Sequence, residues 1–131
     1  MFMDASAIIA ILALEADAQN LSARVTRAEK IFTSPIAVYE ATLGLSRAVD
    51  IGLQEAQLAV NRFLTETRTE ITRIDSKIGA EAILAFSRFG KGRDPAKLNM
   101  GDCFAYACAK ELGVPLLFKG DDFAKTDIEV A

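Results

Sequence analysis

Residues 99–122, NMGDCFAYACAKELGVPLLFKGDD, are the stretch that decides the fold. The alanine-rich part, residues 99–112, predicts a helix, and Gly113 is placed to end it. The apolar run Val114–Phe118 then predicts a buried strand, which two adjacent aspartates follow. A helix that leads directly into a buried strand is a typical unit of an α/β protein.

Helices and short strands alternate over the rest of the chain as well. The predicted strands are residues 2–4, 31–33, 70–74, 114–118 and 127–130. The predicted helices are residues 5–14, 16–30, 34–49, 53–66, 75–89 and 99–112. Ser6 is placed to cap the first helix, and the glycines and Pro95 of residues 90–98 predict a loop. The alternation predicts an α/β fold with a small parallel sheet flanked by helices on both faces.

The length and apolar content fit one folded domain. A chain of 131 residues that is 51% hydrophobic can bury a core of its own, so we expect residues 1–131 to form a single domain. The longest clean apolar run, Ala5–Leu14, is about half of the ~20 residues that a membrane helix needs. Asp4 opens this run and no basic residue precedes it, so we expect neither a membrane segment nor a secretory signal, and a cytoplasmic location.

The absence of histidine narrows the possible chemistry. It excludes histidine-based acid–base pairs and nucleophilic systems, and it removes the commonest zinc ligand. Cys103 and Cys108 point to different faces of one predicted helix, so we interpret them as core residues. The net charge of −3 argues against nucleic-acid binding through overall positive charge. Any hydrolytic chemistry must then depend on carboxylates, lysines or a metal ion.

Acidic residues occupy the places where ligands bind in open α/β sheets, which are the junctions after the strands. Asp4 ends the first predicted strand, and Glu40 lies in the helix after the second. Asp102 opens the alanine-rich helix, and Asp121 and Asp122 follow the strand after it. Carboxylates without histidine or paired cysteine suit Mg²⁺ or Mn²⁺. The set therefore predicts metal-assisted phosphodiester hydrolysis.

Each of these acids also has a structural explanation. Asp4 could cap a helix, although Ser6 is available for that task. Glu40 could belong to an exposed helical stripe, and the aspartate pair could close a turn. Asp102 could interact with the helix dipole. Its neighbours are nearly uncharged, however, and a lone acid there is unfavourable unless it is paired or bound to a metal.

Three segments in this order resemble the PIN-domain ribonucleases of the VapC toxin type. They are MFMDASAIIAIL (residues 1–12), SPIAVYEATLGL (34–45) and GKGRDPAKLNMGDCFAYACAKELGVPLLFKGDDFAKTDI (90–128). The resemblance spans nearly the whole chain and implies a PIN-like fold. It also implies a Mg²⁺- or Mn²⁺-dependent endoribonuclease, often acting on tRNA or rRNA, that a VapB-type antitoxin restrains.

The resemblance also assigns roles to individual residues. The implied catalytic acids are Asp4, Glu40, Asp102 and Asp122. The implied metal ligands are Asp4 and Asp102, supported by Glu40, Asp121, Asp122, Ser6 and Asn99. Glu40 and Asp122 are expected to hold coordinated water or a second ion. The fourth acid stays open between Asp121 and Asp122, because the two are adjacent.

One basic stretch lies just before Asp102 and consists of Arg88, Lys91, Arg93 and Lys97. These side chains could hold the RNA backbone near the metal ion. The alternative is a solvated loop on an acidic protein.

Association with other chains is expected on two grounds. The apolar helices around Ala41–Val49 and Leu53–Leu64 favour a homodimer. The implied antitoxin would lay a segment across the acidic groove and place an arginine among the carboxylates.

Two other classes of function stay open. One is a catalytically inactive PIN-fold module that only binds proteins, although four intact acids argue against it. The other is a metal-dependent phosphatase for small phosphate esters, although the chain has no Gly-rich phosphate loop and no dinucleotide-binding fingerprint.

Overall fold

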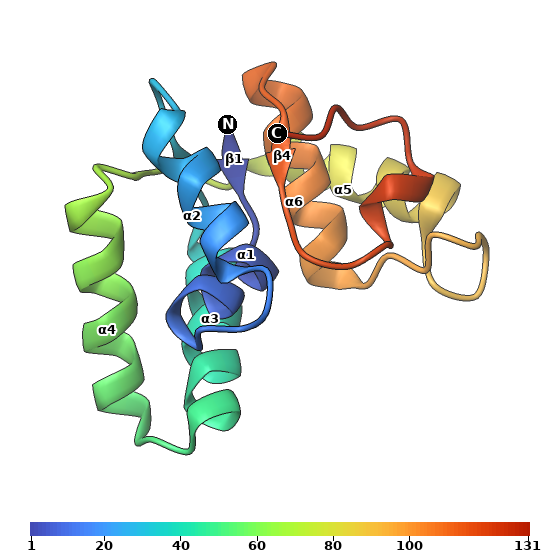
Figure 1. Cartoon of the computed structure of the whole chain (residues 1–131). Coiled ribbons are helices and arrows are strands. Elements are labelled where there is room, and N and C mark those ends of the chain that lie inside the picture. The colour runs from blue at the N-terminus through green and yellow to red at the C-terminus, as the bar shows by residue number, and fades with distance from the viewer.

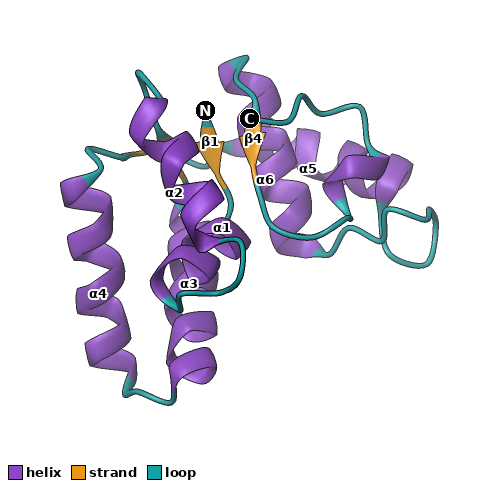
Figure 2. Ribbon diagram, viewed as in Figure 1, coloured by secondary structure: helices purple, strands orange, loops and turns teal.

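A four-stranded parallel sheet forms the centre of the fold in this computed structural model, which describes residues 1–131 (Figures 1 and 2). The strands are β1 (Phe2–Met3), β2 (Phe32–Thr33), β3 (Glu70–Ile71) and β4 (Leu116–Leu117). The helices are α1 (Ala5–Leu12), α2 (Ala18–Arg27), α3 (Pro35–Val49), α4 (Leu53–Glu66), α5 (Ser76–Phe89) and α6 (Met100–Leu112), and a 3-10 turn, η1, covers Phe123–Lys125.

The strand order β3-β2-β1-β4 places the first strand in the middle of the sheet. Phe2 of β1 lies opposite both Phe32 of β2 and Leu116 of β4. Since all four strands run parallel, their carboxyl ends meet at one edge, and ligands of open α/β sheets bind at such an edge. The Thr33 hydroxyl donates to the Met3 carbonyl at 2.9 Å just there, in the buried interior.

Successive strand residues enter two separate cores, because side chains alternate between the faces of a sheet. Met3 and Leu117 pack into the core that contains α1, α2, α3 and α4. Phe2 and Leu116 pack into the core that contains α5 and α6. Figure 1 shows the two groups of helices on opposite sides of β1 and β4. The predicted small parallel sheet with helices on both faces is therefore confirmed.

The C-terminal segment differs from the prediction. Residues 127–130 do not form a strand, and only an isolated bridge joins Leu116 to Val130. Two backbone bonds join the segment to β4, since the Leu116 N–H donates to the Glu129 carbonyl at 2.8 Å and the Ala131 N–H donates to the Leu116 carbonyl at 3.0 Å. Side chains hold its start: the Tyr106 hydroxyl donates to Asp127 Oδ1 at 2.5 Å, and Arg88 pairs with Asp127 Oδ2 at 3.3 Å. The loop predicted at residues 90–98 is present.

Exposed apolar residues occur on α3 and α4 and also on α5 and α6. The apolar residues of α3 and α4 pack largely between these helices, and their exposed members are Tyr39, Val49, Leu53 and Leu58. An apolar hollow of ≈ 540 Å³ lies between α5 and α6, and Ile83, Phe86 and Met100 contribute to its walls. No helix is both long enough and apolar enough to cross a membrane.

Candidate metal centre

Three carboxylates from distant parts of the chain meet in one pocket at the carboxyl edge of the sheet. Asp4, Glu40 and Asp102 line this hollow of ≈ 380 Å³. The remaining lining residues are Ala5, Ser6, Ile9, Tyr39, Leu43, Gly44, Arg47 and Asn99. Five residues of the predicted site therefore line this acidic pocket, namely Asp4, Ser6, Glu40, Asn99 and Asp102. Their roles at a metal ion stay a prediction.

Asp4 lies at the deepest point of the acidic pocket, with 4% of its surface exposed. It follows β1 directly and is itself the N-cap of α1, because its Oδ2 accepts the Ser6 backbone N–H at 2.9 Å. The expectation that Ser6 caps α1 was wrong, since the helix begins at Ala5 and Ser6 lies inside its first turn. The Ser6 hydroxyl donates to the same Oδ2 at 2.5 Å and accepts the Lys119 backbone N–H at 3.0 Å. Ser6 therefore fixes the Asp4 carboxylate and ties it to the segment after β4.

Asp102 is held by a reciprocal capping arrangement at the start of α6. Its backbone N–H donates to Asn99 Oδ1 at 2.9 Å, and its Oδ2 accepts the Asn99 backbone N–H at 2.9 Å. Burial, together with the charges of Asp4 and Asp122, raises the pKa of Asp102 to about 6. The hydrogen bond from Asn99 lowers this pKa and so opposes the shift. Burial also raises the pKa of Asp4, and the two Ser6 hydrogen bonds oppose this.

Glu40 reaches the acidic pocket from α3 and rests against the backbone of Gly101. A Cβ atom at position 101 would lie 2.0 Å from Glu40 Oε1, so a side chain there would occupy the space of the carboxylate. Burial, and then the nearby charges of Asp4 and Asp102, raise the pKa of Glu40 to about 7. Sequence reasoning missed Gly101, although a glycine beside Asp102 in the first helical turn was a signal, because glycine is unfavourable in helices.

The carboxylates of the acidic pocket have no cationic partner. No lysine or arginine forms an ion pair with Asp4, Glu40 or Asp102, whereas surface acids such as Glu66 and Glu111 do have partners. Buried like charges of this kind are unfavourable unless a proton or a cation neutralises them.

This donor set fits a hard divalent cation, since all donors are oxygens. No three acidic side chains are spaced closely enough to enclose an ion by themselves. An ion in this pocket would bind through one or two carboxylates and keep several water ligands, as Mg²⁺ commonly does.

Asp121 and Asp122 are the two candidates for the fourth predicted acid, and only Asp122 acts on a carboxylate of the acidic pocket. Asp122 precedes η1 and contributes to the raised pKa of Asp102, whereas Asp121 does not contribute. Both side chains are exposed, and neither lines the acidic pocket. This difference favours Asp122, whose role stays a prediction.

The predicted basic stretch divides into two parts. Lys91, Arg93 and Lys97 line one surface hollow that is separate from the acidic pocket. Arg88 lies apart from them on α5, where it pairs with Asp127 and stacks over the Phe89 ring at 4.6 Å. RNA contact by these residues stays a prediction, and the structure gives Arg88 a different partner.

Comparison with known proteins places the chain in a family. The family model described as the PIN domain matches residues 1–129. The chain belongs to the PIN-domain family. This PIN domain is 39% identical to a VapC ribonuclease of Rhizobium meliloti, over 97% of this chain and 98% of that protein. It is 40% identical to a ribonuclease VapC of Mycolicibacterium smegmatis, over 98% and 97% of the two chains.

A solved structure supports the fold of this PIN domain independently. It is that of Mycobacterium tuberculosis VapC20, which is described as a toxin that cleaves the sarcin-ricin loop. The TM-score is 0.80 over 99% of this chain and 97% of that one, at 15% sequence identity. At that identity the likeness concerns the fold alone.

Replacing Gly101 tests whether its missing side chain positions Glu40. We expect Gly101→Ala to push the Glu40 carboxylate toward solvent and to lower its pKa from about 7 toward the usual 4.5, as followed by carbon NMR of the Glu40 carboxyl group. Stability should stay constant or rise by up to ~1 kcal/mol, because alanine favours a helix. The control Gly79→Ala, at a helical site with open space around it, should leave the Glu40 pKa unchanged. An unaltered Glu40 pKa in Gly101→Ala would contradict this role.

Neutralising Glu40 should stabilise the metal-free protein at high pH. The folded-state pKa lies above the unfolded value, so Glu40 lowers the free energy of unfolding progressively as the pH rises from 4.5 to about 7. Glu40→Gln should therefore gain on the order of 1 kcal/mol at pH ~8, a value discounted because the side chain is only half-buried. The gain should vanish near pH ~4. Urea unfolding in EDTA at both pH values measures this, and a loss of stability at the higher pH would refute it.

Proposed function

We propose that this protein is a metal-dependent endoribonuclease and the toxin of a type II toxin–antitoxin system. The observation that carries the proposal is the acidic pocket, in which three carboxylates without a cationic partner converge at the ligand-binding edge of a parallel sheet. Membership of the PIN-domain family and whole-length relatives named VapC ribonucleases support the same assignment.

The residues of the acidic pocket would have different roles in binding metal and water. Asp4 and Asp102 would hold Mg²⁺, or Mn²⁺ in its place, and Glu40 and Asp122 would hold coordinated water or a second ion. When bound, such an ion would activate a water molecule and stabilise the charge that develops on the phosphodiester. Ser6 and Asn99 keep the two ligand carboxylates in fixed orientations through their hydrogen bonds.

RNA is the proposed substrate, and tRNA or rRNA the expected class. Lys91, Arg93 and Lys97 carry three positive charges on one exposed loop before α6, which suits contacts to the RNA backbone. Charge reversal at these positions should weaken RNA binding and leave metal affinity unchanged. Equal RNA binding by the charge-reversed protein would show that this loop does not contact the RNA.

A VapB-type antitoxin is the proposed partner, and the toxin is expected to form a homodimer in the cytoplasm. An arginine of the antitoxin placed among the carboxylates would supply the ion-pair partner that they lack. The apolar hollow between α5 and α6 is a surface of the kind that dimers bury. Co-expression with the neighbouring gene should yield a complex, and purification of the toxin without a small partner would argue against it.

A catalytically inactive binding module is the alternative function. Such a module would need no buried acid, whereas here Asp4 is almost completely buried and Glu40 and Asp102 have raised pKa values. These features are unfavourable for folding and are explained by a bound cation.

Cleavage of RNA by the purified protein tests the proposal. We expect Mg²⁺ or Mn²⁺ to support cuts in total tRNA and rRNA, and EDTA to abolish them. Asp4→Asn should reduce cleavage at least ~100-fold, because it removes a charged ligand while keeping an acceptor for the Ser6 N–H.

Two matched variants compare the candidates for the fourth acid. Asp122→Asn should reduce cleavage more than Asp121→Asn, since Asp122 is the acid that acts on Asp102. Folded, antitoxin-free protein that cuts no RNA with either ion would favour the binding module. Cleavage that persists undiminished in Asp4→Asn would exclude the acidic pocket as the active site.

A further inference from the structure

One face of α3 carries two exposed side chains at the rim of the acidic pocket that the proposed chemistry does not use. The pocket-lining residues of this helix are Tyr39, Glu40, Leu43, Gly44 and Arg47. Their spacing is that of a single helical stripe, so Tyr39 and Arg47 lie along the same wall as the carboxylate of Glu40.

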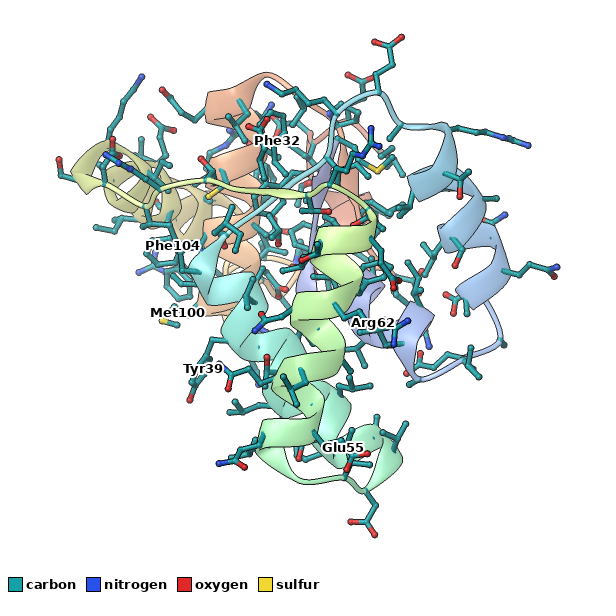
Figure 3. All side chains as sticks on the ribbon, turned by 90° about the vertical axis from the view of Figure 1, so that its left-hand side faces the viewer. Phe32, Tyr39, Glu55, Arg62, Met100 and Phe104 are labelled. Carbon is teal, nitrogen blue, oxygen red and sulfur yellow. The ribbon has the colours of Figure 1, made fainter.

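Tyr39 presents an aromatic ring to solvent beside the carboxylates. Its side chain is 64% exposed, and its hydroxyl forms no hydrogen bond within the protein. Figure 3 places Tyr39 on the same side of the molecule as Met100, the first residue of α6. An exposed ring that supports no part of the core is suited to stacking with an unpaired nucleobase.

Arg47 is the only basic side chain that lines the acidic pocket. It is exposed and forms no ion pair with any carboxylate. Arg47 lies about 10 Å along α3 from Glu40 and lines the same pocket. A free guanidinium at this distance from a metal site is suited to a neighbouring phosphate rather than to the reacting one.

The middle of the stripe is an apolar part of the pocket between these two groups. Ile9 of α1 packs against Gly44, where a Cβ would lie 2.2 Å from Ile9 Cδ1. The pocket surface between Glu40 and Arg47 is therefore apolar, formed by Ile9, Leu43 and Gly44.

We infer that Tyr39 and Arg47 form a subsite for one unpaired nucleotide of the RNA next to the scissile bond, with Tyr39 stacking on its base and Arg47 binding its phosphate. The inference rests on the proposed function and adds a preference for single-stranded over paired RNA. A base inside a duplex is already stacked on both faces and offers no free face to Tyr39.

Binding of a short single-stranded RNA tests the subsite without cleavage when Ca²⁺ replaces Mg²⁺. Measured by fluorescence anisotropy, Tyr39→Ala should weaken binding about tenfold, and Tyr39→Phe should bind as the unchanged protein does, because stacking needs only the ring. Arg47→Gln should weaken binding and reduce the slope of log affinity against log salt by about 0.7, the loss expected for one phosphate contact on a single strand. Binding of duplex RNA should change little in Tyr39→Ala.

Matched controls separate these effects from general ones. Leu58→Ala removes an exposed apolar side chain on α4, and Arg68→Gln removes an exposed positive charge before β3, at the other edge of the sheet. Both should bind the RNA like the unchanged protein. Mn²⁺ affinity, measured by calorimetry without RNA, should stay within about twofold in Tyr39→Ala.

The outcomes distinguish the subsite from the proposed function. Loss of affinity in Tyr39→Ala and of salt dependence in Arg47→Gln supports the subsite, whether or not the RNA is later cut. Unchanged RNA binding in both variants overturns it and leaves this face to a protein partner. An Arg47→Gln variant that gains Mn²⁺ affinity with unchanged RNA binding overturns it as well, because Arg47 would then serve only to offset the charge of the carboxylates. Failure of the proposed function would appear separately, as absent Mn²⁺ binding in the unchanged protein.

Discussion

The burial of three carboxylates in one pocket is the constraint on which the rest of this structure depends. Asp4, Glu40 and Asp102 line the same pocket because the parallel sheet brings its carboxyl ends to one edge and α3 and α6 start there. Burial is the largest cause of their raised pKa values, and repulsion by neighbouring carboxylates adds to it for Glu40 and Asp102. The Ser6 hydroxyl and the capping arrangement of Asn99 are important under this constraint, because their hydrogen bonds fix the carboxylates of Asp4 and Asp102.

The close approach of α3 to α6 and to α1 depends on two glycines, Gly101 and Gly44. Gly101 leaves space for the Glu40 carboxylate, and Gly44 lets α3 lie close against Ile9 of α1. The two separate cores on the faces of the sheet hold these helices in place, so the geometry of the site is a consequence of packing on both faces. A stable fold and an acidic pocket are thus linked through the same helices.

Much of this arrangement could be predicted from the sequence, and the parts that could not have physical reasons. Asp4 stands at a predictable junction between a strand and a helix, and Asp102 stands at the predictable start of a helix. Ser6 was wrongly expected to cap α1, because helix boundaries are uncertain by one or two residues and Asp4 and Ser6 are both good caps. The predicted strand at residues 127–130 is reduced to a bridge at Val130, and side-chain bonds to Asp127, which no local pattern encodes, hold the start of that segment. Gly101, Tyr39 and Arg47 gain their roles only from contacts across the fold.

Anomalous diffraction from crystals soaked in Mn²⁺ would show whether the acidic pocket binds a metal ion, because it locates the ion without reference to activity. We expect an anomalous peak in the acidic pocket within coordination distance of Asp4 and Asp102, and loss of this peak in Asp4→Asn crystals soaked in the same way. A peak at another site, or an acidic pocket that stays free of Mn²⁺ at saturating concentration while its carboxylates are ionised, would contradict this expectation.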